Sequence, residues 1–141
     1  MKRRVLLLRT CYWFGAAFDA VTVFPMLLPS VAARVFGIDN FHPGVEYRYA
    51  MFLAASLMLG WTALLVWAAK KPVERTAVLA LTVCPVVLGL AAAGVFAVWE
   101  GLIPAGRMLP TWTVQAALVA VFTYAYRNES GTDASRTRQS E

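Results

Sequence analysis

The sequence predicts an all-α integral membrane protein: a bundle of four transmembrane helices with a short interfacial helix in its first outer loop and both termini in the cytoplasm. Three observations support this fold class. Of the 141 residues, 60% are hydrophobic and 15% are charged, whereas soluble domains have roughly 45–50% apolar and about 25% charged residues. Four apolar stretches each approach the ~20 residues that cross a bilayer as a helix. Basic residues cluster at alternate ends of these stretches.

The first predicted helix covers residues 10–28 of a single transmembrane domain, 1–127. Its basic start resembles a secretory signal. Arg9 interrupts the apolar run, however, and the bulky Trp13 and Phe14 follow without a small-residue cleavage site. We therefore expect a first helix that is retained.

The remaining spans are predicted at residues 50–69, 76–99 and 108–126. Lys70, Lys71 and Pro72 lie in the short connection between the second and third spans, which should form a tight antiparallel hairpin. Residues 128–141 are rich in Ser, Thr, Gly, Arg and Glu, a composition that predicts a disordered cytoplasmic tail.

The first outer loop contains the predicted interfacial helix. Ser30 is a candidate N-cap and Gly37 a candidate stop. The apolar residues between them lie opposite Arg34, the pattern of a short helix in the plane of the membrane surface; they are Val31, Val35 and Phe36.

The basic residues predict the orientation. Ten of the 13 lie before the first span, between the second and third, or after the fourth, and an excess of Lys and Arg marks cytoplasmic segments. An even number of spans also requires both termini on one side. The pI near 9.6 therefore reflects topology and attraction to anionic lipid headgroups, and we expect no nucleic-acid partner.

Asp19 is the outstanding candidate for function. It lies ten residues past Arg9, about 15 Å into the membrane, where a carboxylate costs at least ~2.5–3.5 kcal/mol. It needs a partner or a proton, and we expect it to be largely protonated or in contact with water at neutral pH. The polar groups at its depth define a ligand-binding or proton-linked site of Asp19, Trp61, Thr22, Ser56 and Thr82. Alternatively, Asp19 ties the first helix to its neighbours by a hydrogen bond.

Two prolines and several small residues give weaker signals. Pro25 and Pro85 each free a backbone carbonyl inside a span, so a kink at Pro25 could open a pocket toward the outer leaflet, although a tolerated packing kink is the simpler interpretation. The pairs Ser56 to Gly60 and Gly89 to Ala93 have the spacing that allows two helices to approach closely.

A polar cluster is predicted on the outer face: His42, Glu46, Arg48 and Glu100. One histidine without a second at ligand spacing is a weak metal signal, so we predict no metal site and favour solvated charges or an ion pair between Glu100 and Arg48. Cys11 and Cys84 lie at different depths and cannot form a disulfide in this topology. The sequence identifies no cofactor.

These observations predict a small multi-pass protein of the bacterial inner membrane that binds a hydrophobic ligand or a partner membrane protein within or against the bundle. The alternative is a proton-coupled small-molecule transporter that uses Asp19, as a homo-oligomer. An enzyme acting on lipids is the third choice, and we expect no catalytic residues. Small multidrug-resistance transporters also have four helices and an acid in the first, but they lack the long first outer loop and Pro25, so we assign the sequence to no family.

Overall fold

The structure, a computed structural model, describes residues 2–38 and 41–137. These residues are helical almost throughout and contain no strand. The helices in chain order are α1 (Lys2–Leu27), α2 (Pro29–Phe36), α3 (Val45–Lys70), α4 (Ala77–Leu81), the π-helical η1 (Thr82–Val87), α5 (Leu88–Trp99) and α6 (Ala105–Thr137).

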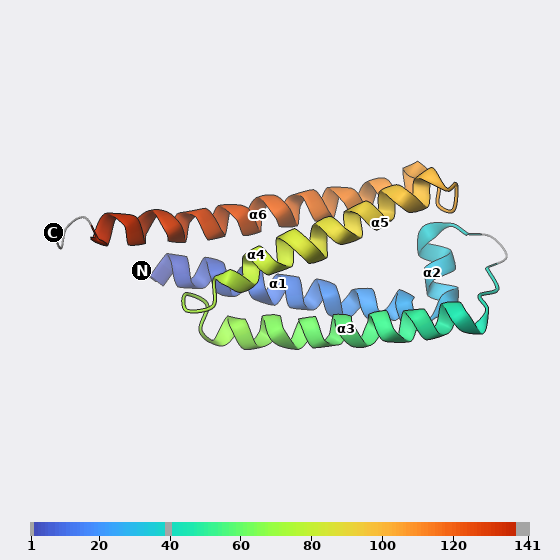
Figure 1. The fold of residues 1–141 in the computed structure, drawn as a ribbon, viewed down its shortest axis with the longest axis horizontal. Coiled ribbons are helices and arrows are strands. Elements are labelled where there is room, and N and C mark those ends of the chain that lie inside the picture. The colour runs from blue at the N-terminus through green and yellow to red at the C-terminus, as the bar shows by residue number, and fades with distance from the viewer. Residues whose placement is uncertain (1, 39–40, 138–141) are drawn as a thin grey trace.

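The long helices run up and down beside one another (Figure 1). Helices α1 and α3 lie side by side and antiparallel, while α4, η1 and α5 form one continuous diagonal rod that leads from this pair toward α6. The start of α1, the end of α6 and the α3–α4 turn lie at one end of the bundle, and α2 and the α5–α6 loop lie at the other.

Among the described residues, three helical segments are long and apolar enough to cross a membrane: Val45–Lys70, Ala77–Trp99 and Ala105–Tyr126. A fourth candidate span is obtained when α1 and α2 are taken as one segment, although these two helices are bent by 107° at their junction. Helix α1 is weaker alone because it carries Arg9 and Asp19 among its apolar residues. The prediction of an all-helical membrane protein is thus confirmed, with three to four candidate spans.

The predicted spans match observed helices except at Leu28 and Thr76, which lie one residue outside α1 and α4, and three of the helices extend well beyond the predicted bounds. Helix α1 begins at Lys2, α3 begins at Val45, and α6 continues to Thr137. Residues 128–137, predicted to be disordered, are therefore helical, and 138–141 lie outside the described residues. Polar composition alone does not end a helix: no proline follows Pro110, and a single interior glycine costs only about 1 kcal/mol.

Helix α2 exists, but its predicted N-cap is wrong. Leu28 occupies the N-cap position and Pro29 opens the helix, because the fixed φ of proline suits the first helical residue and its missing N–H would be unpaired there anyway. The predicted stop is confirmed: Gly37 has φ 67°, in the left-handed region that favours glycine.

The two prolines inside the spans have different effects. Pro25 remains within α1, and the sharp bend comes later, between Leu27 and Pro29. Pro85 lies inside the π-helical η1. A π turn is one way for a helix to accommodate a residue that cannot donate to the carbonyl four residues before it.

The α3–α4 turn is held by several local contacts. The Arg75 guanidinium lies 3.3 Å above the centre of the Trp67 ring and donates to the Trp67 carbonyl. The hydroxyl of Tyr12, on α1, donates to the Arg75 carbonyl at 2.9 Å. Lys71 and Glu74 form an exposed salt bridge of 2.9 Å. The predicted connection is therefore short and tight, but α4, η1 and α5 diverge from α3 along the diagonal seen in Figure 1.

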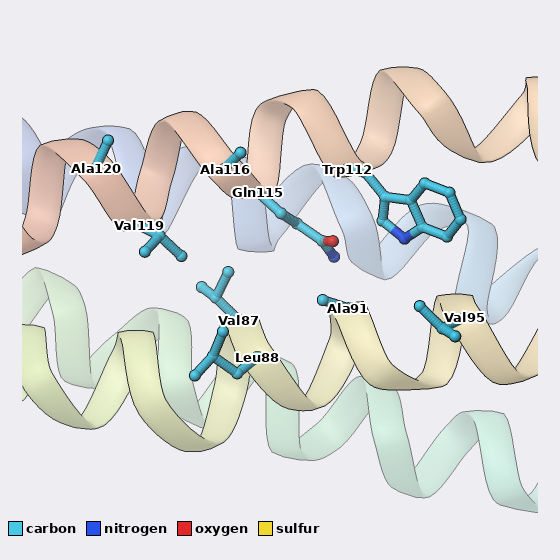
Figure 2. A pocket seen from close by; sticks show the side chains of 9 residues that line it. All are labelled: Val87, Leu88, Ala91, Val95, Trp112, Gln115, Ala116, Val119 and Ala120. Atoms are coloured by element: carbon cyan, nitrogen blue, oxygen red, sulfur yellow. The ribbon is translucent and has the colours of Figure 1, made fainter.

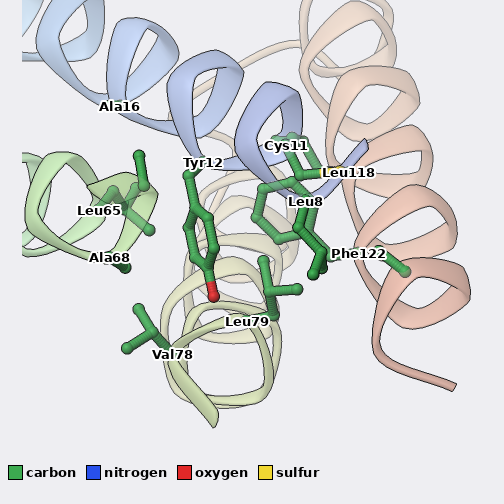
Figure 3. Packing of buried hydrophobic residues seen from close by; sticks show 12 residues of the cluster. Leu8, Cys11, Tyr12, Ala16, Leu65, Ala68, Val78, Leu79, Leu118 and Phe122 are labelled. Carbon is green, nitrogen blue, oxygen red and sulfur yellow. The ribbon is translucent and has the colours of Figure 1, made fainter. Parts of the chain in front are cut away.

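The hydrophobic core lies near this same end. Its largest fully buried side chains are Tyr12, Phe122, Leu8, Leu65 and Leu79, from α1, α3, α4 and α6 (Figure 3). The outer surface is apolar as well: Trp99 is 85% exposed, Val45 78% and Leu57 75%. Large apolar side chains directed outward on this scale are what a lipid-facing surface requires.

Candidate functional site

Asp19 is buried in the bundle, as the sequence analysis required of an intramembrane carboxyl. It is 8% exposed, and its Oδ2 atom has no hydrogen-bond partner in the part of the chain that the structure describes. It lies on α1 between Ala16, which belongs to the main core, and Val23, which packs with Ala55 and Met58 of α3.

The polar residues predicted around Asp19 make other hydrogen bonds. Thr22 donates to the Phe18 carbonyl of its own helix at 2.8 Å. Ser56 is exposed and donates to the Leu53 carbonyl at 2.8 Å. The structure therefore does not assemble these hydroxyls around the Asp19 carboxyl.

Trp61 and Thr82 are brought together, but with each other. The Trp61 indole Nε1 donates to Thr82 Oγ1 at 3.3 Å, and Thr82 Oγ1 donates to the Val78 carbonyl at 2.7 Å. Thr82 is the first residue of the π-helical η1. This pair is thus a polar tie between α3 and the third span.

A second polar site lies between α5 and α6, where a groove of about 460 Å³ is present. We call it the α5–α6 groove, and nine residues line it: Val87, Leu88, Ala91, Val95, Trp112, Gln115, Ala116, Val119 and Ala120 (Figure 2). Seven of the nine are aliphatic. Several, including Leu88, Ala116 and Ala120, are exposed, so the groove opens on the side of the bundle.

Gln115 and Trp112 supply the polar atoms of this groove. Gln115 is 7% exposed, and neither its Oε1 atom nor the indole Nε1 of Trp112 has a hydrogen-bond partner among the described residues. Figure 2 shows both side chains reaching from α6 toward α5, with the indole nitrogen and the amide turned toward each other. A buried acceptor and a buried donor thus point toward each other at the wall of the groove, and neither is paired within the described residues.

The sequence of α5 makes room for the indole. A Cβ atom on Gly94 would lie 3.0 Å from Trp112 Nε1 and 3.3 Å from Met108 Cε, so a glycine lets α6 place its aromatic edge against α5. Neither Trp112 nor Gln115 was predicted as a site residue from the sequence. Their spacing of three residues inside an apolar span was the available signal, because residues i and i+3 share one face of a helix.

Asp19 and Gln115 lie at nearly the same level of the bundle. The register is given by Gly15, where a Cβ atom would lie 3.1 Å from the Phe122 ring. From that contact Asp19 is about 6 Å and Gln115 about 10 Å toward the α2 end, at 1.5 Å per residue. Asp19 does not line the α5–α6 groove.

Another groove, of about 370 Å³, lies between α1 and α6. We call it the α1–α6 groove; its lining includes Leu7, Phe14, Ala117 and Val121. Its one hydroxyl, on Thr10, already donates to the Leu6 carbonyl at 2.9 Å. The Thr10 hydroxyl is therefore already bonded, and the α1–α6 groove offers a ligand a mainly apolar surface.

The sequence predicted a cluster of polar residues on the outer face. His42, Glu46, Arg48 and Glu100 are all exposed, and Arg48 and Glu100 make no ion pair with each other in the described structure. Arg48 instead lines a small hollow of about 150 Å³ beside Tyr47 and Phe52. Within the described ranges, no group of three His, Cys, Asp or Glu side chains could hold a metal ion.

Comparison with known proteins gives no relative from which a role could be transferred. No protein-family model, no curated protein and no solved structure matches this chain.

Proposed function

We propose that this chain is a four-span membrane protein that binds a hydrophobic small molecule in the α5–α6 groove. The observation that supports this most directly is Gln115, which lines an otherwise largely aliphatic groove of about 460 Å³ and whose buried amide oxygen has no hydrogen-bond partner in the described part of the chain. Ligand pockets have roughly 300–1,000 Å³, apolar walls and a few polar groups that fix orientation.

The energetic reason is the position of the unpaired atom. Leaving a buried acceptor unsatisfied costs about 1–3 kcal/mol, and a hydrocarbon environment provides no water to satisfy it. Gln115 lies ten residues into α6, about 15 Å from the start of that helix. A ligand that donates a hydrogen bond there would recover the cost.

The four-span arrangement rests on the pairing of α1 with α3. Helix α3 is a candidate span on its own, and α1 runs beside it with 26 residues, about 39 Å of helix against ~30 Å of hydrocarbon. We further propose that α2 lies in the outer interface and that both termini face the cytoplasm of a bacterial cell, since most basic residues belong to that end.

The test compares a substitution that should fill the α5–α6 groove with a matched substitution in the α1–α6 groove. Ala116 and Ala117 are adjacent exposed residues of α6, and they line the α5–α6 groove and the α1–α6 groove respectively. The purified protein is photolabelled with dodecanol carrying a diazirine, with and without excess unlabelled dodecanol, and the labelled peptides are mapped. We expect saturable labelling of α5 and α6 that Ala116→Phe removes and Ala117→Phe retains.

Equal labelling of the two variants, or labelling that excess dodecanol does not reduce, would rule out this site. Native mass spectrometry of the same samples reports copurifying lipids and subunit number. A copurifying membrane protein that Ala116→Phe displaces would instead identify the groove as a partner interface, the other form of binding that the sequence predicted.

A second candidate function is proton-coupled transport, because the Asp19 carboxyl is buried with an unpartnered Oδ2 atom. The test uses tetraphenylphosphonium as a lipophilic cation in proteoliposomes with an imposed pH gradient. Transport requires accumulation by the unmodified protein and its loss in Asp19→Asn. No accumulation by the unmodified protein would reject proton-driven transport of this cation.

A further inference from the structure

We infer that the α5–α6 groove selects a neutral lipid with a single hydroxyl group, which accepts a hydrogen bond from Trp112 Nε1 and donates one to Gln115 Oε1. The inference rests on the proposed function above and specifies the chemical class of the ligand. It follows from the two unpaired polar atoms of the groove and from the chemistry of the walls around them.

The two atoms have opposite hydrogen-bonding character. An indole N–H only donates, and an amide oxygen only accepts. Each is buried and lacks a partner among the described residues, so they do not bond to each other although Figure 2 shows them turned toward each other. Side chains at i and i+3 start about 5–6 Å apart at their Cβ atoms, a spacing that one bridging oxygen can span.

Few functional groups satisfy both atoms at once. A hydroxyl accepts and donates, whereas an ether or a ketone can only accept. No charged side chain lines the groove, so a carboxylate or an ammonium group would lose its hydration without a counter-ion. A neutral hydroxyl is the group that the donor and acceptor pair fits.

The walls select the rest of the molecule. The other seven lining residues are Val, Leu and Ala from η1, α5 and α6, and they suit a hydrocarbon body. Gly94 is a positioning residue because a side chain there would displace the indole edge. Long-chain and isoprenoid alcohols have this combination of one hydroxyl and an apolar body.

The experiment compares three photoprobes with the same chain and diazirine: dodecanol, its methyl ether and dodecane. For the unmodified protein we expect labelling of α5 and α6 by dodecanol to exceed labelling by the ether about tenfold, as loss of one hydrogen bond of roughly 1.4 kcal/mol implies, and to exceed labelling by dodecane, which loses both bonds, about a hundredfold. The probes differ only in the polar group, so their ratio does not depend on the yield of folded protein.

Two substitutions test the two hydrogen bonds separately. Trp112→Phe removes the donor but keeps an aromatic ring, and Gln115→Met removes the acceptor at similar length. Each should lower the dodecanol-to-dodecane ratio about tenfold, because one of the two hydrogen bonds remains, while dodecane labelling persists. Trp99→Phe is the matched control, since Trp99 is 85% exposed and lies outside the groove, and it should keep the selectivity.

The outcomes separate this inference from the proposed function. Equal saturable labelling by all three probes overturns the hydroxyl but retains a hydrophobic-ligand site. Equal labelling by dodecanol and its ether overturns donation to Gln115. Selectivity that neither substitution lowers overturns the role of the pair, as expected if bound water satisfies it. No saturable labelling by any probe overturns the proposed function itself.

Discussion

Asp19 is the only acidic residue in the sequence that lies inside a predicted span. The sequence placed a carboxyl near the middle of the first span, and the structure buries it without a partner for Oδ2. A helix-tying role requires a hydrogen bond that substitution would break. None is observed for that atom among the described residues, so the tie is the role that the structure favours least.

We therefore predict that Asp19→Asn changes the free energy of unfolding by less than about 0.5 kcal/mol, because the near-isosteric amide replaces a group that has no observed bond to lose. The measurement is thermal unfolding of the detergent-solubilised protein. A loss of about 1 kcal/mol or more would contradict this and support the helix tie, since interhelical hydrogen bonds in membranes are worth roughly that much.

Thr82 should behave in the opposite way. Thr82→Val keeps the shape but removes the acceptor for Trp61 Nε1, so we expect a loss of about 1 kcal/mol in the same assay. Thr113→Val is the control, because Thr113 is exposed and donates only to the Leu109 carbonyl of its own helix. Equal effects of the two substitutions would mean that the tie between α3 and η1 contributes nothing.

For single residues, the sequence predicted their depth in the bundle but not which of them contact one another. Trp61, Thr82 and Asp19 were correctly expected inside the bundle, where the structure leaves the first half-buried and the other two buried. Which of them meet depends on the rotation of each helix about its axis, and no single-helix pattern specifies that rotation. Gln115 and Trp112 were not predicted as site residues for the same reason.

Among the elements, the helices were easier to predict than their contacts. Apolar runs identified the spans because hydrocarbon permits few alternatives to a helix. The polar ends of α1, α3 and α6 were missed because the apolar pattern stops before the helix does. The small-residue pairs were also misleading: a Cβ atom on Gly60 or Gly89 would meet nothing within 4 Å.

Side chains from α3 and α6 closely approach the backbone of α1 at Gly15. A Cβ atom there would lie 3.1 Å from Phe122 and 3.3 Å from Leu65, both almost fully buried. We predict that Gly15→Ala lowers the free energy of unfolding by about 1 kcal/mol, because overpacking displaces neighbours that have little freedom. Gly60→Ala should instead be neutral or stabilising by up to about 1 kcal/mol, since alanine is the better helix former.

These two variants are compared by thermal unfolding in one detergent. The difference in sign is the critical result, as both substitutions add the same methyl group to the interior of a long helix. Destabilisation by Gly60→Ala alone would show that the outward face of α3 packs against a second copy of the chain, and it would restore the packing interpretation of the Ser56 and Gly60 pair.

The molecule as a whole has its polar groups at the ends and its apolar groups on the sides. The alternation of basic residues along the chain predicted which ends of the spans lie on the same side. The structure gathers the start of α1, the end of α6 and the α3–α4 turn at one end of the bundle. Which end faces the cytoplasm is set by the membrane, through the preference of basic residues for the cytoplasmic side.

We predict that the α2 end faces the outside. In a background of Cys11→Ala and Cys84→Ala, single cysteines replace Ser30, Leu102 and Val73, which are exposed on α2, the α5–α6 loop and the α3–α4 turn. A membrane-impermeant maleimide should label the first two in intact spheroplasts and the third only after permeabilisation. An N-terminal epitope tag should resist external protease, because α1 crosses the membrane and places the tag in the cytoplasm. If the tag is cleaved in intact spheroplasts while the cysteine results are unchanged, α1 does not cross the membrane and the protein has three spans.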